Sequence, residues 1–253
     1  MAAEYKNIDV RGTAIANITM QEAVLLADEY ITSDNKYPMT VVTPNAEIVQ
    51  SCIENGEIAK VVGDASIRLP DGSGVLLAAK ILGTPLKEKV AGIEFGENLL
   101  KLCAQKGYKV FFLGAKPGVA DAAAEKLKAA HEGLCICGTN DGYFKKEGEE
   151  NEKIIQKIID SKADVLFVCL GAPAQEKWMA QNKEKLCGLK LMAGLGGSLD
   201  VFAGTAKRAP KFFLKFHLEW LYRLLCQPSR IGRMMKLPKF IFGTILYNIR
   251  KKR

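Results

Sequence analysis

Short apolar segments alternate with longer amphipathic segments over most of the chain. The short segments predict strands at residues 7–10, 40–43, 66–69, 109–113, 164–170 and 190–195. The longer segments repeat their apolar residues with a helical period and predict helices at residues 20–31, 47–54, 74–82, 95–105, 119–130, 150–161 and 175–186. The run at 165–170 is apolar throughout, which is typical of a strand covered on both faces of a parallel sheet.

This alternation predicts an α/β fold with a Rossmann-like core, in which right-handed crossovers join a largely parallel sheet. Thr19 and Glu22 have the spacing of a capping box at the start of the first helix. The chain has 253 residues and no internal repeat, so one large domain, or one domain with an extension, is expected. We place an α/β core at residues 1–206 and a basic helical appendage at residues 207–253.

Charge supports this division of the chain. The appendage has 13 Lys and Arg residues against a single acidic residue, Glu219, which gives it a net charge of +12. The core carries the remaining charge of −4. Eight of the 20 aromatic residues also lie in the appendage. A basic, aromatic extension on a nearly neutral body predicts contact with an anionic partner.

An anionic membrane surface is the partner that we expect for the appendage. Its residues 211–225 have a helical period, with Phe213 and Trp220 on one face and basic residues on another. Phe240 and Phe242 lie close to Lys236 and are expected to contact lipid. Near anionic lipids each Lys or Arg contributes about 1 kcal/mol, and aromatic rings settle at the interface.

The sequence also predicts a compartment. The apolar stretch at residues 240–249 would cover only about half of a hydrocarbon layer as a helix, so it is expected not to span a membrane. Seven cysteines, an odd number spread along the chain, are typical of a reducing compartment. Residues 1–6 lack the pattern of a signal peptide. We expect a cytoplasmic protein that associates peripherally with the inner face of the cell membrane.

Five predicted strands run into loops that combine small residues with a polar group. These loops are residues 44–47, 70–74, 114–118, 171–176 and 196–200. Glycine lets a ligand approach the backbone, and the helix that follows offers free N–H groups to an anionic oxygen. Each loop by itself is also explained as a simple turn. Because the carboxyl ends of parallel strands meet at one edge, five such loops together favour a ligand site.

Within these loops, Asp71 is the candidate acid or base. It follows a strand and lies between Pro70 and Gly72, where a carboxylate is able to remove a proton from a hydroxyl group. A Pro-Asp-Gly turn accounts for the same residues. Thr43 and Asn45 follow another strand, where they could orient a sugar or cap the next helix.

Several common kinds of site are missing from the sequence. The loop that begins at Gly114 lacks the third glycine of a dinucleotide-binding fingerprint, and there is no phosphate-binding P-loop. His131 and His217 have no His or Cys at ligand spacing, so no metal site is expected. No Asp-x-Asp pair is present to hold a metal and a sugar nucleotide. Cationic side chains would then have to neutralise a bound diphosphate.

Nine collinear blocks, taken together, resemble the WecG/TagA/CpsF family of bacterial glycosyltransferases over nearly the whole chain. The blocks are residues 43–49, 70–75, 112–120, 142–144, 171–178, 194–204, 207–210, 218–224 and 228–233. The resemblance implies an inverting, metal-independent enzyme without a cofactor. It would move N-acetylmannosamine or a related sugar from a UDP donor to undecaprenyl-diphosphate-linked GlcNAc, a step that builds the wall teichoic acid linkage unit in Gram-positive relatives.

The resemblance also implies roles for individual residues. Asp71 matches the proposed catalytic base, and Thr43 and Asn45 match residues that line the same pocket. The substrate-binding residues expected on this basis are Gln175, Arg223, Arg230, Arg233, Lys89, Gly114, Tyr143, Gly171 and Asp200. The three arginines match residues of the appendage that are thought to reach the donor diphosphate. Lys89 stands where many members have arginine, and lysine keeps the charge but loses the bidentate geometry.

Two other classes of function remain open at this point. A nucleotide-binding oxidoreductase would also use glycine-rich loops after parallel strands. A nucleic-acid-binding protein would also interleave aromatic and basic residues, although the loops of the core are better suited to a small ligand. We therefore expect UDP-sugar, the lipid-linked acceptor and an anionic membrane as partners, and no nucleic acid. The sequence leaves a homo-oligomer open.

Overall fold

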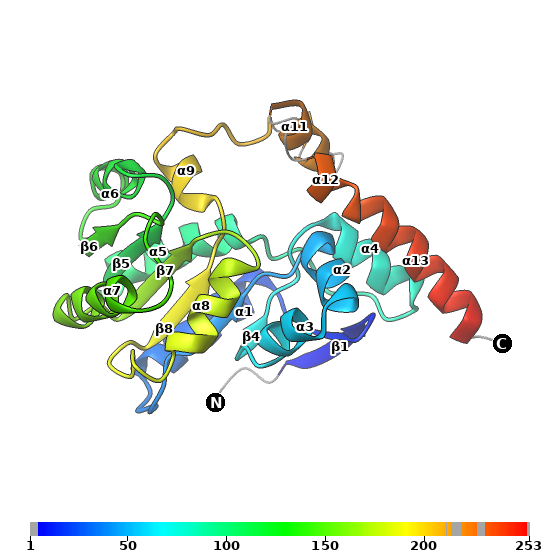
Figure 1. Ribbon diagram of the computed structural model, residues 1–253, viewed down its shortest axis with the longest axis horizontal. Helices are drawn as coiled ribbons and strands as arrows, with labels where there is room; N and C mark the ends of the chain where they lie inside the picture. The colour runs from blue at the N-terminus through cyan, green and yellow to red at the C-terminus, as the bar shows by residue number, and fades with distance from the viewer. Residues whose placement is uncertain (1–4, 211, 214–218, 227–230, 252–253) are drawn as a thin grey trace.

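A six-stranded parallel sheet forms the centre of the molecule. The computed structural model describes residues 5–210, 212–213, 219–226 and 231–251. The strands, in the order β4-β3-β8-β7-β5-β6, are β4 (Ile67–Arg68), β3 (Met39–Val42), β8 (Leu191–Gly194), β7 (Val165–Cys169), β5 (Lys109–Gly114) and β6 (Cys135–Asn140). All five pairings between neighbours are parallel. The predicted Rossmann-like α/β core is therefore confirmed (Figure 1).

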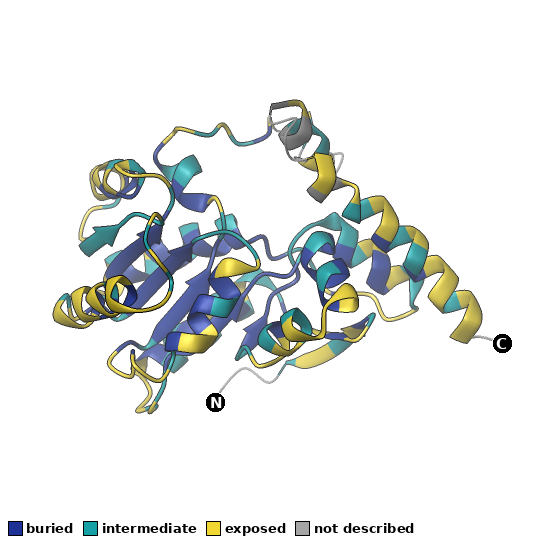
Figure 2. Ribbon diagram, in the orientation of Figure 1, coloured by how far each residue is buried: buried dark blue, intermediate teal, exposed yellow. Residues whose placement is uncertain are grey.

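Helices cover both faces of this sheet. The helices on one face are α1 (Met20–Thr32), α5 (Gly92–Lys106), α6 (Val119–Ala130) and α9 (Ser198–Phe202). The helices on the other are α2 (Ala46–Glu54), α3 (Gly56–Gly63), α7 (Glu149–Asp160) and α8 (Ala174–Asn182). Neighbouring strand residues alternate between the two layers: Phe112 packs with the first and Phe111 with the second. Helices bury both faces of the central strands, which explains why β7 is apolar throughout (Figure 2).

A third, smaller layer joins the N-terminal hairpin to the appendage. The antiparallel strands β1 (Lys6–Val10) and β2 (Thr13–Asn17) share an apolar cluster with α4 (Ser73–Ile81) and α13 (Lys236–Lys251). Phe240 of α13 is completely buried in this cluster, against the expectation that it contacts lipid. A helical period shows which residues share a face, but it does not show which face has a partner in the core. The other described helices of the appendage are α11 (Glu219–Cys226) and α12 (Ile231–Met234).

Most elements begin and end close to their predicted bounds, and the capping box at Thr19 and Glu22 is confirmed. Within the described part of the core, the elements that were not predicted are β2, α3, β6 and α9. The β1–β2 turn has positive φ at both Arg11 and Gly12, and Asp9 Oδ1 accepts a hydrogen bond from Gly12 N. β6 is half-exposed at an edge of the sheet, so its sequence lacks the apolar run of a central strand.

Among the described helices, none combines the length and apolar character that crossing a bilayer requires.

Candidate active site

The loops singled out in the sequence lie together at the carboxyl edge of the sheet. β3 leads through α2 and α3 to β4 at one side, whereas β8 leads to α9, which packs against α6 on the other side. The chain therefore leaves the neighbouring strands β3 and β8 in opposite directions. β5 and β7 make a second such point, because β5 leads outward to β6 and β7 leads inward to β8. Open α/β sheets bind their ligands at these switch points.

Thr43 and Asn45 follow β3 at the first switch point. Thr43 is buried, and its Oγ1 donates a hydrogen bond to the carbonyl oxygen of Gly194 at 3.2 Å, which joins the ends of β3 and β8. Asn45 is the N-cap of α2, since its Oδ1 accepts from Ile48 N at 3.0 Å. A Cβ atom at Gly92 would lie 3.0 Å from Thr43 Oγ1, so the start of α5 approaches the same point. Free N–H groups of two helix starts thus face this edge.

Asp71 is half-buried in the loop after β4. Its backbone N–H donates to the carbonyl oxygen of Pro44 at 3.3 Å, and Val90 N donates to the carbonyl oxygen of Pro70 at 2.8 Å. The neighbouring Gly72 has a φ of +80°, and a Cβ added there would lie 3.8 Å from Asn45 Cβ. Asp71 is therefore held beside the β3 loop, which brings the three candidate catalytic residues into one region.

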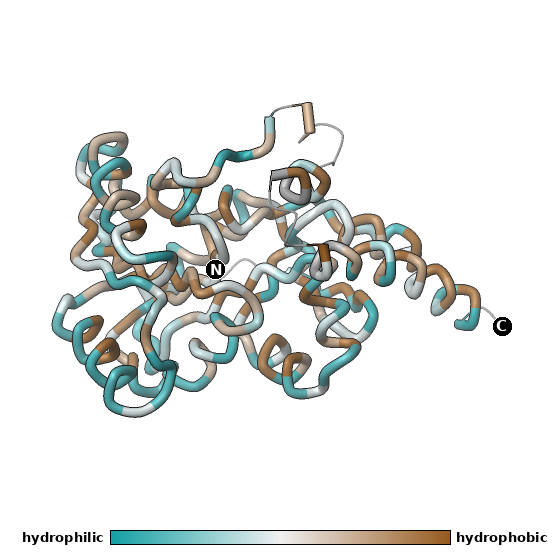
Figure 3. The backbone as a smooth tube through the Cα atoms, turned by 45° about the horizontal axis from the view of Figure 1, so that its top comes forward, coloured by the Kyte–Doolittle hydropathy of each residue, from teal (hydrophilic) through white to brown (hydrophobic). Residues whose placement is uncertain are grey.

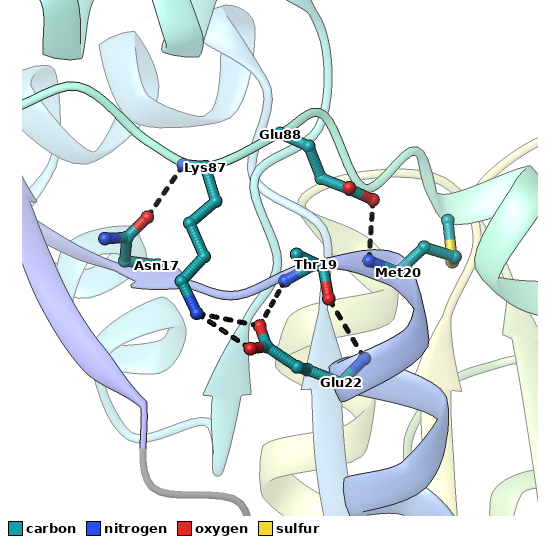
Figure 4. Close-up of polar contacts among 6 residues, drawn as sticks. All are labelled: Asn17, Thr19, Met20, Glu22, Lys87 and Glu88. Atoms are coloured by element: carbon teal, nitrogen blue, oxygen red, sulfur yellow. Dashed lines mark hydrogen bonds and ion pairs between the residues drawn. The ribbon is translucent and has the colours of Figure 1, made fainter.

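Lys89 belongs to a loop that is fastened to the start of α1 (Figure 4). Glu88 Oε1 accepts a hydrogen bond from Met20 N at 2.7 Å. Two residues on, Val90 is buried and bonded to Pro70. Lys89 is thus held between two anchored neighbours and close in sequence to the contact that fixes the Asp71 loop.

An ion pair strengthens this fastening. Lys87 Nζ contacts both carboxylate oxygens of Glu22, at 2.8 and 3.0 Å, and its backbone N–H donates to Asn17 Oδ1 at 2.8 Å (Figure 4). Glu22 also accepts from Thr19 N in the capping box. The hydrogen bond from Lys87 holds the pKa of Glu22 below its usual value. The loop is tied to the core by the same carboxylate that caps α1.

Gln175 lies at the start of α8, directly after the β7 loop. It is buried, and its Oε1 accepts a hydrogen bond from Gly196 N at 2.9 Å, while its Nε2 donates to Glu176 Oε1 at 2.9 Å. Gln175 therefore joins the loops after β7 and β8. Burial raises the pKa of the nearby Cys169 thiol to about 12, so this cysteine stays protonated and is unsuited to act as a nucleophile.

The expected residues after β5 and β6 lie further from Asp71. Gly114 has a φ of +136°, and a Cβ there would be 2.3 Å from the carbonyl oxygen of Cys169, so only glycine fits. Gly142 N donates to the carbonyl oxygen of Ala115 and holds the exposed Tyr143 at the same edge. β4 and β6 are the two edge strands, so at ~4.8 Å per strand Tyr143 follows a strand about 24 Å from that of Asp71.

Gly171 and Asp200 lie between these two ends of the edge. Gly171 has a φ of +78°, and its carbonyl oxygen accepts from Gln175 N at 2.9 Å, which starts α8. Asp200 is half-buried in α9, and its carbonyl oxygen accepts from Ala206 N at 2.9 Å. Asp200 thus helps to turn the chain from the core toward the appendage.

The profile of the glycosyl transferase WecG/TagA/CpsF family matches residues 8–253, which includes every strand end described above. The chain belongs to this family. Similar proteins include the N-acetylglucosaminyldiphosphoundecaprenol N-acetyl-beta-D-mannosaminyltransferase of Bacillus spizizenii strain W23, 41% identical over 81% of this chain and 78% of that protein. The protein of the same name from Staphylococcus aureus strain MRSA252 is 34% identical over 93% of this chain and 91% of its own length.

Family membership identifies the chain as a glycosyltransferase, and not as an oxidoreductase. The resemblance to the family predicts that Arg223, Arg230 and Arg233 of the appendage reach the donor diphosphate. Arg230 and the side chains of Arg223 and Arg233 lie outside the described residues, so this role stays a prediction. Arg223 lies in α11 and Arg233 in α12, and both helices precede α13, which reaches the core.

The start of α13 lies close to the loop of Asp71. A Cβ atom at Gly74 would be 2.7 Å from Leu237 Cδ1 and 2.9 Å from Ala46 Cβ. The appendage helix is therefore seated where the first turns of α4 and α2 meet, directly behind Asp71 and Asn45. The contact of Leu237 could not be predicted from the sequence, because a single leucine in a basic segment does not indicate which residues it packs against.

In the part of the chain that the structure describes, no three His, Cys, Asp or Glu residues are grouped so as to hold a metal ion. A buried charged residue beside Gln175 that the sequence did not single out is Glu176, which is 2% exposed. Its neighbour Trp178 is also buried and donates through Nε1 to Asn151 Oδ1. A first helical turn rich in polar residues gives no indication that a carboxylate is buried there.

Proposed function

We infer that this glycosyltransferase moves N-acetylmannosamine, or a related sugar, from a UDP donor to undecaprenyl-diphosphate-linked GlcNAc. The main support is that Thr43, Asn45 and Asp71 lie at one switch point of the sheet. The chain also matches, over 93% of its length, a relative that is named for this transfer. Linkage-unit synthesis for wall teichoic acid, or for another surface polymer, is the pathway that we propose.

In the proposed mechanism Asp71 acts as general base. The acceptor hydroxyl oxygen attacks the anomeric carbon of the donor from the face opposite the leaving group, and the proton of that hydroxyl passes to the Asp71 carboxylate. The bond between the anomeric carbon and the UDP oxygen breaks, so the product has inverted configuration and UDP leaves with the bonding electrons. The position of Asp71 supports this role, because its backbone is bonded to Pro44 while the residue is only half-buried.

Charge on the leaving diphosphate needs stabilisation. The starts of α2 and α5 converge near Thr43 and offer backbone N–H groups to an anion. We propose that Lys89 and the arginines at positions 223, 230 and 233 supply the positive charge, since a guanidinium fork matches phosphate oxygens. The sequence has no Asp-x-Asp pair, so we expect these groups, and no metal ion, to bear this role.

The appendage is proposed to rest on the membrane that holds the acceptor. Many of its apolar side chains are exposed: Leu225, Ile231, Met235, Phe242, Ile245, Leu246, Tyr247 and Ile249. Lys236, Lys239, Arg250 and Lys251 flank them along α13. Apolar side chains among basic ones suit the headgroup level of an anionic bilayer, where the acceptor diphosphate also lies.

The deciding experiment is a transfer assay with the purified protein. It would be incubated with a short-chain lipid-diphosphate-GlcNAc analogue and a panel of UDP-sugars, and the release of UDP would be measured. We expect release that depends on both substrates and is largest with UDP-N-acetylmannosamine. Release with no donor in the panel, or without any need for the acceptor, would contradict the proposal.

Metal independence is tested in the same assay. Turnover is expected to survive an excess of EDTA. If chelation abolished turnover and magnesium restored it, charge neutralisation by Lys89 and the arginines would be refuted.

A further inference from the structure

A buried carboxylate that the proposed mechanism does not use lies next to the candidate site. Glu176 and Gln175 are each only 2% exposed, in the first turn of α8. Moving a carboxylate out of water is unfavourable unless hydrogen bonds and nearby dipoles compensate. The start of a helix supplies part of that compensation, because its dipole favours negative charge. A carboxylate retained at this cost calls for a role.

The hydrogen bonds of Gln175 allow its amide a single orientation. A backbone N–H only donates, so the side-chain oxygen of Gln175 must face Gly196 N. The amide nitrogen then faces Glu176 Oε1, which accepts its hydrogen bond at 2.9 Å. Glu176 thus holds the amide of Gln175 in the orientation that Gly196 requires.

The chain of contacts continues across three strands. Gly196 begins the turn after β8, with a φ of +57°. Two residues earlier, a Cβ at Gly194 would lie 3.0 Å from Gln175 Nε2, so the amide packs directly against β8. On the far side of β8, the carbonyl oxygen of Gly194 accepts the hydrogen bond from Thr43. We call Glu176, Gln175, Gly196, Gly194 and Thr43 the edge brace.

We propose that Glu176 is a positioning residue that acts through Gln175 on the turn that follows β8, and that the edge brace fixes this turn and the end of β8 against Thr43 for sugar transfer. Glu176 itself contacts no substrate in this account. In the same account the role of Gln175 is to hold the turn, because its side-chain oxygen accepts the hydrogen bond from Gly196 N. The inference rests on the proposed function in one respect: it assumes that this turn faces the bound substrates.

A swap of the two side chains tests the brace. Gln175→Glu alone places two carboxylates side by side and should disturb the turn. Gln175→Glu combined with Glu176→Gln restores the pattern, because a carboxylate at 175 accepts from both Gly196 N and the new amide at 176. Glu176→Gln alone keeps an acceptor oxygen of the same size and should have a small effect. Thermal unfolding would confirm that each variant is folded.

The first readout is kinetic. We expect Gln175→Glu to lower kcat about 100-fold with little change in KM, since misplacing a site by about 1 Å has effects of this size. The double variant should recover most of that loss. An effect on KM alone, or a double variant no better than Gln175→Glu, would overturn the proposal.

The second readout needs no substrate. Amide hydrogen exchange at Gly196 should speed up in Gln175→Glu and return toward the parent rate in the double variant. Unchanged exchange in Gln175→Glu would refute the brace even if turnover falls. If the parent protein transferred none of the sugars offered, the proposed function would be contradicted. The hydrogen-exchange measurement would still test the edge brace, because it needs no substrate.

Discussion

The carboxyl edge of the core and the appendage helix α13 are held in place by different interactions. At the edge, Thr43 Oγ1 donates a buried hydrogen bond to the carbonyl oxygen of Gly194, and Gln175 Oε1 accepts one from Gly196 N. These two bonds fix the turns after β3, β7 and β8. The polar contacts of α13 lie nearer the surface: Lys236 and Lys239 contact α2, and Asn248 Nδ2 donates to the carbonyl oxygen of Ile81. Buried bonds specify one geometry, whereas surface ion pairs contribute little free energy.

Apolar burial is also divided differently between the two regions. The edge is backed by strands that are covered on both faces, whereas α13 buries Phe240 and leaves Phe242 65% exposed. Figure 3 shows hydrophobic segments recurring along α13, and Figure 1 shows its C-terminal end extending beyond the core. The comparison supports the proposed division of roles, with the chemistry at the fixed edge and contact with the membrane at α13. The boundary at residue 206 stays a prediction, but the burial of Phe240 shows that α13 contributes to the core.

The largest effect should come from the edge. Asp71→Asn removes the proposed base while keeping the shape of the side chain, so kcat should fall by about 10²–10⁴. UDP release would be measured alongside thermal unfolding, which should be unchanged. Asp64→Asn, at an exposed aspartate after α3, is the matched control and should keep full activity. A folded Asp71→Asn protein with parental turnover would remove Asp71 from the mechanism.

The next effect concerns how α13 is attached. Phe240→Ala should lower the free energy of unfolding by about 3–5 kcal/mol, because it opens a cavity among Val10, Val49 and Val75. Denaturant unfolding would measure the loss. Phe242→Ala should change stability by less than about 0.5 kcal/mol, since Phe242 is exposed. Equal effects of the two substitutions would mean that α13 is not seated on the core as described.

The difference between the edge of the sheet and α13 also explains which features could be predicted from the sequence. Strand 165–170 could be recognised because burial on both faces leaves only apolar residues, and parallel strands must bring their loops to one edge. β6 could not, because Gly138 sits against the Phe111 ring, where a Cβ would lie 2.5 Å from the ring. Such packing is a property of two segments distant in sequence. Phe240 and Glu176 were missed for the same reason, since burial depends on partners that no local pattern names.

A smaller effect is expected from the exposed face of α13. Phe242→Ser should weaken binding to vesicles of phosphatidylglycerol and phosphatidylcholine by about tenfold or more, because inserting a phenyl ring is worth about 1.5–3 kcal/mol. Co-sedimentation would measure the bound fraction. Leu25→Ser, at an exposed leucine of α1, is the control and should bind as the parent does. If both variants bound equally well, the membrane surface would have to lie elsewhere.

The smallest effect should come from Glu54, which pairs with Lys239 at 2.6 Å and with Lys236 at 3.8 Å. The hydrogen bond from Lys239 holds the pKa of Glu54 below its usual value. A carboxylate whose pKa is lowered by folding stabilises the protein above its unfolded pKa, and this contribution is lost as the pH falls through the folded pKa. Glu54→Gln should therefore cost about 0.2–1 kcal/mol near pH 7 and less at higher salt, since these groups are partly exposed. Denaturant unfolding at pH 7 and below pH 4 would show the difference shrink, whereas Glu132→Gln, at an exposed residue, should be neutral at both. A Glu54→Gln loss that persisted in acid would mean that packing, and not charge, joins α13 to α2.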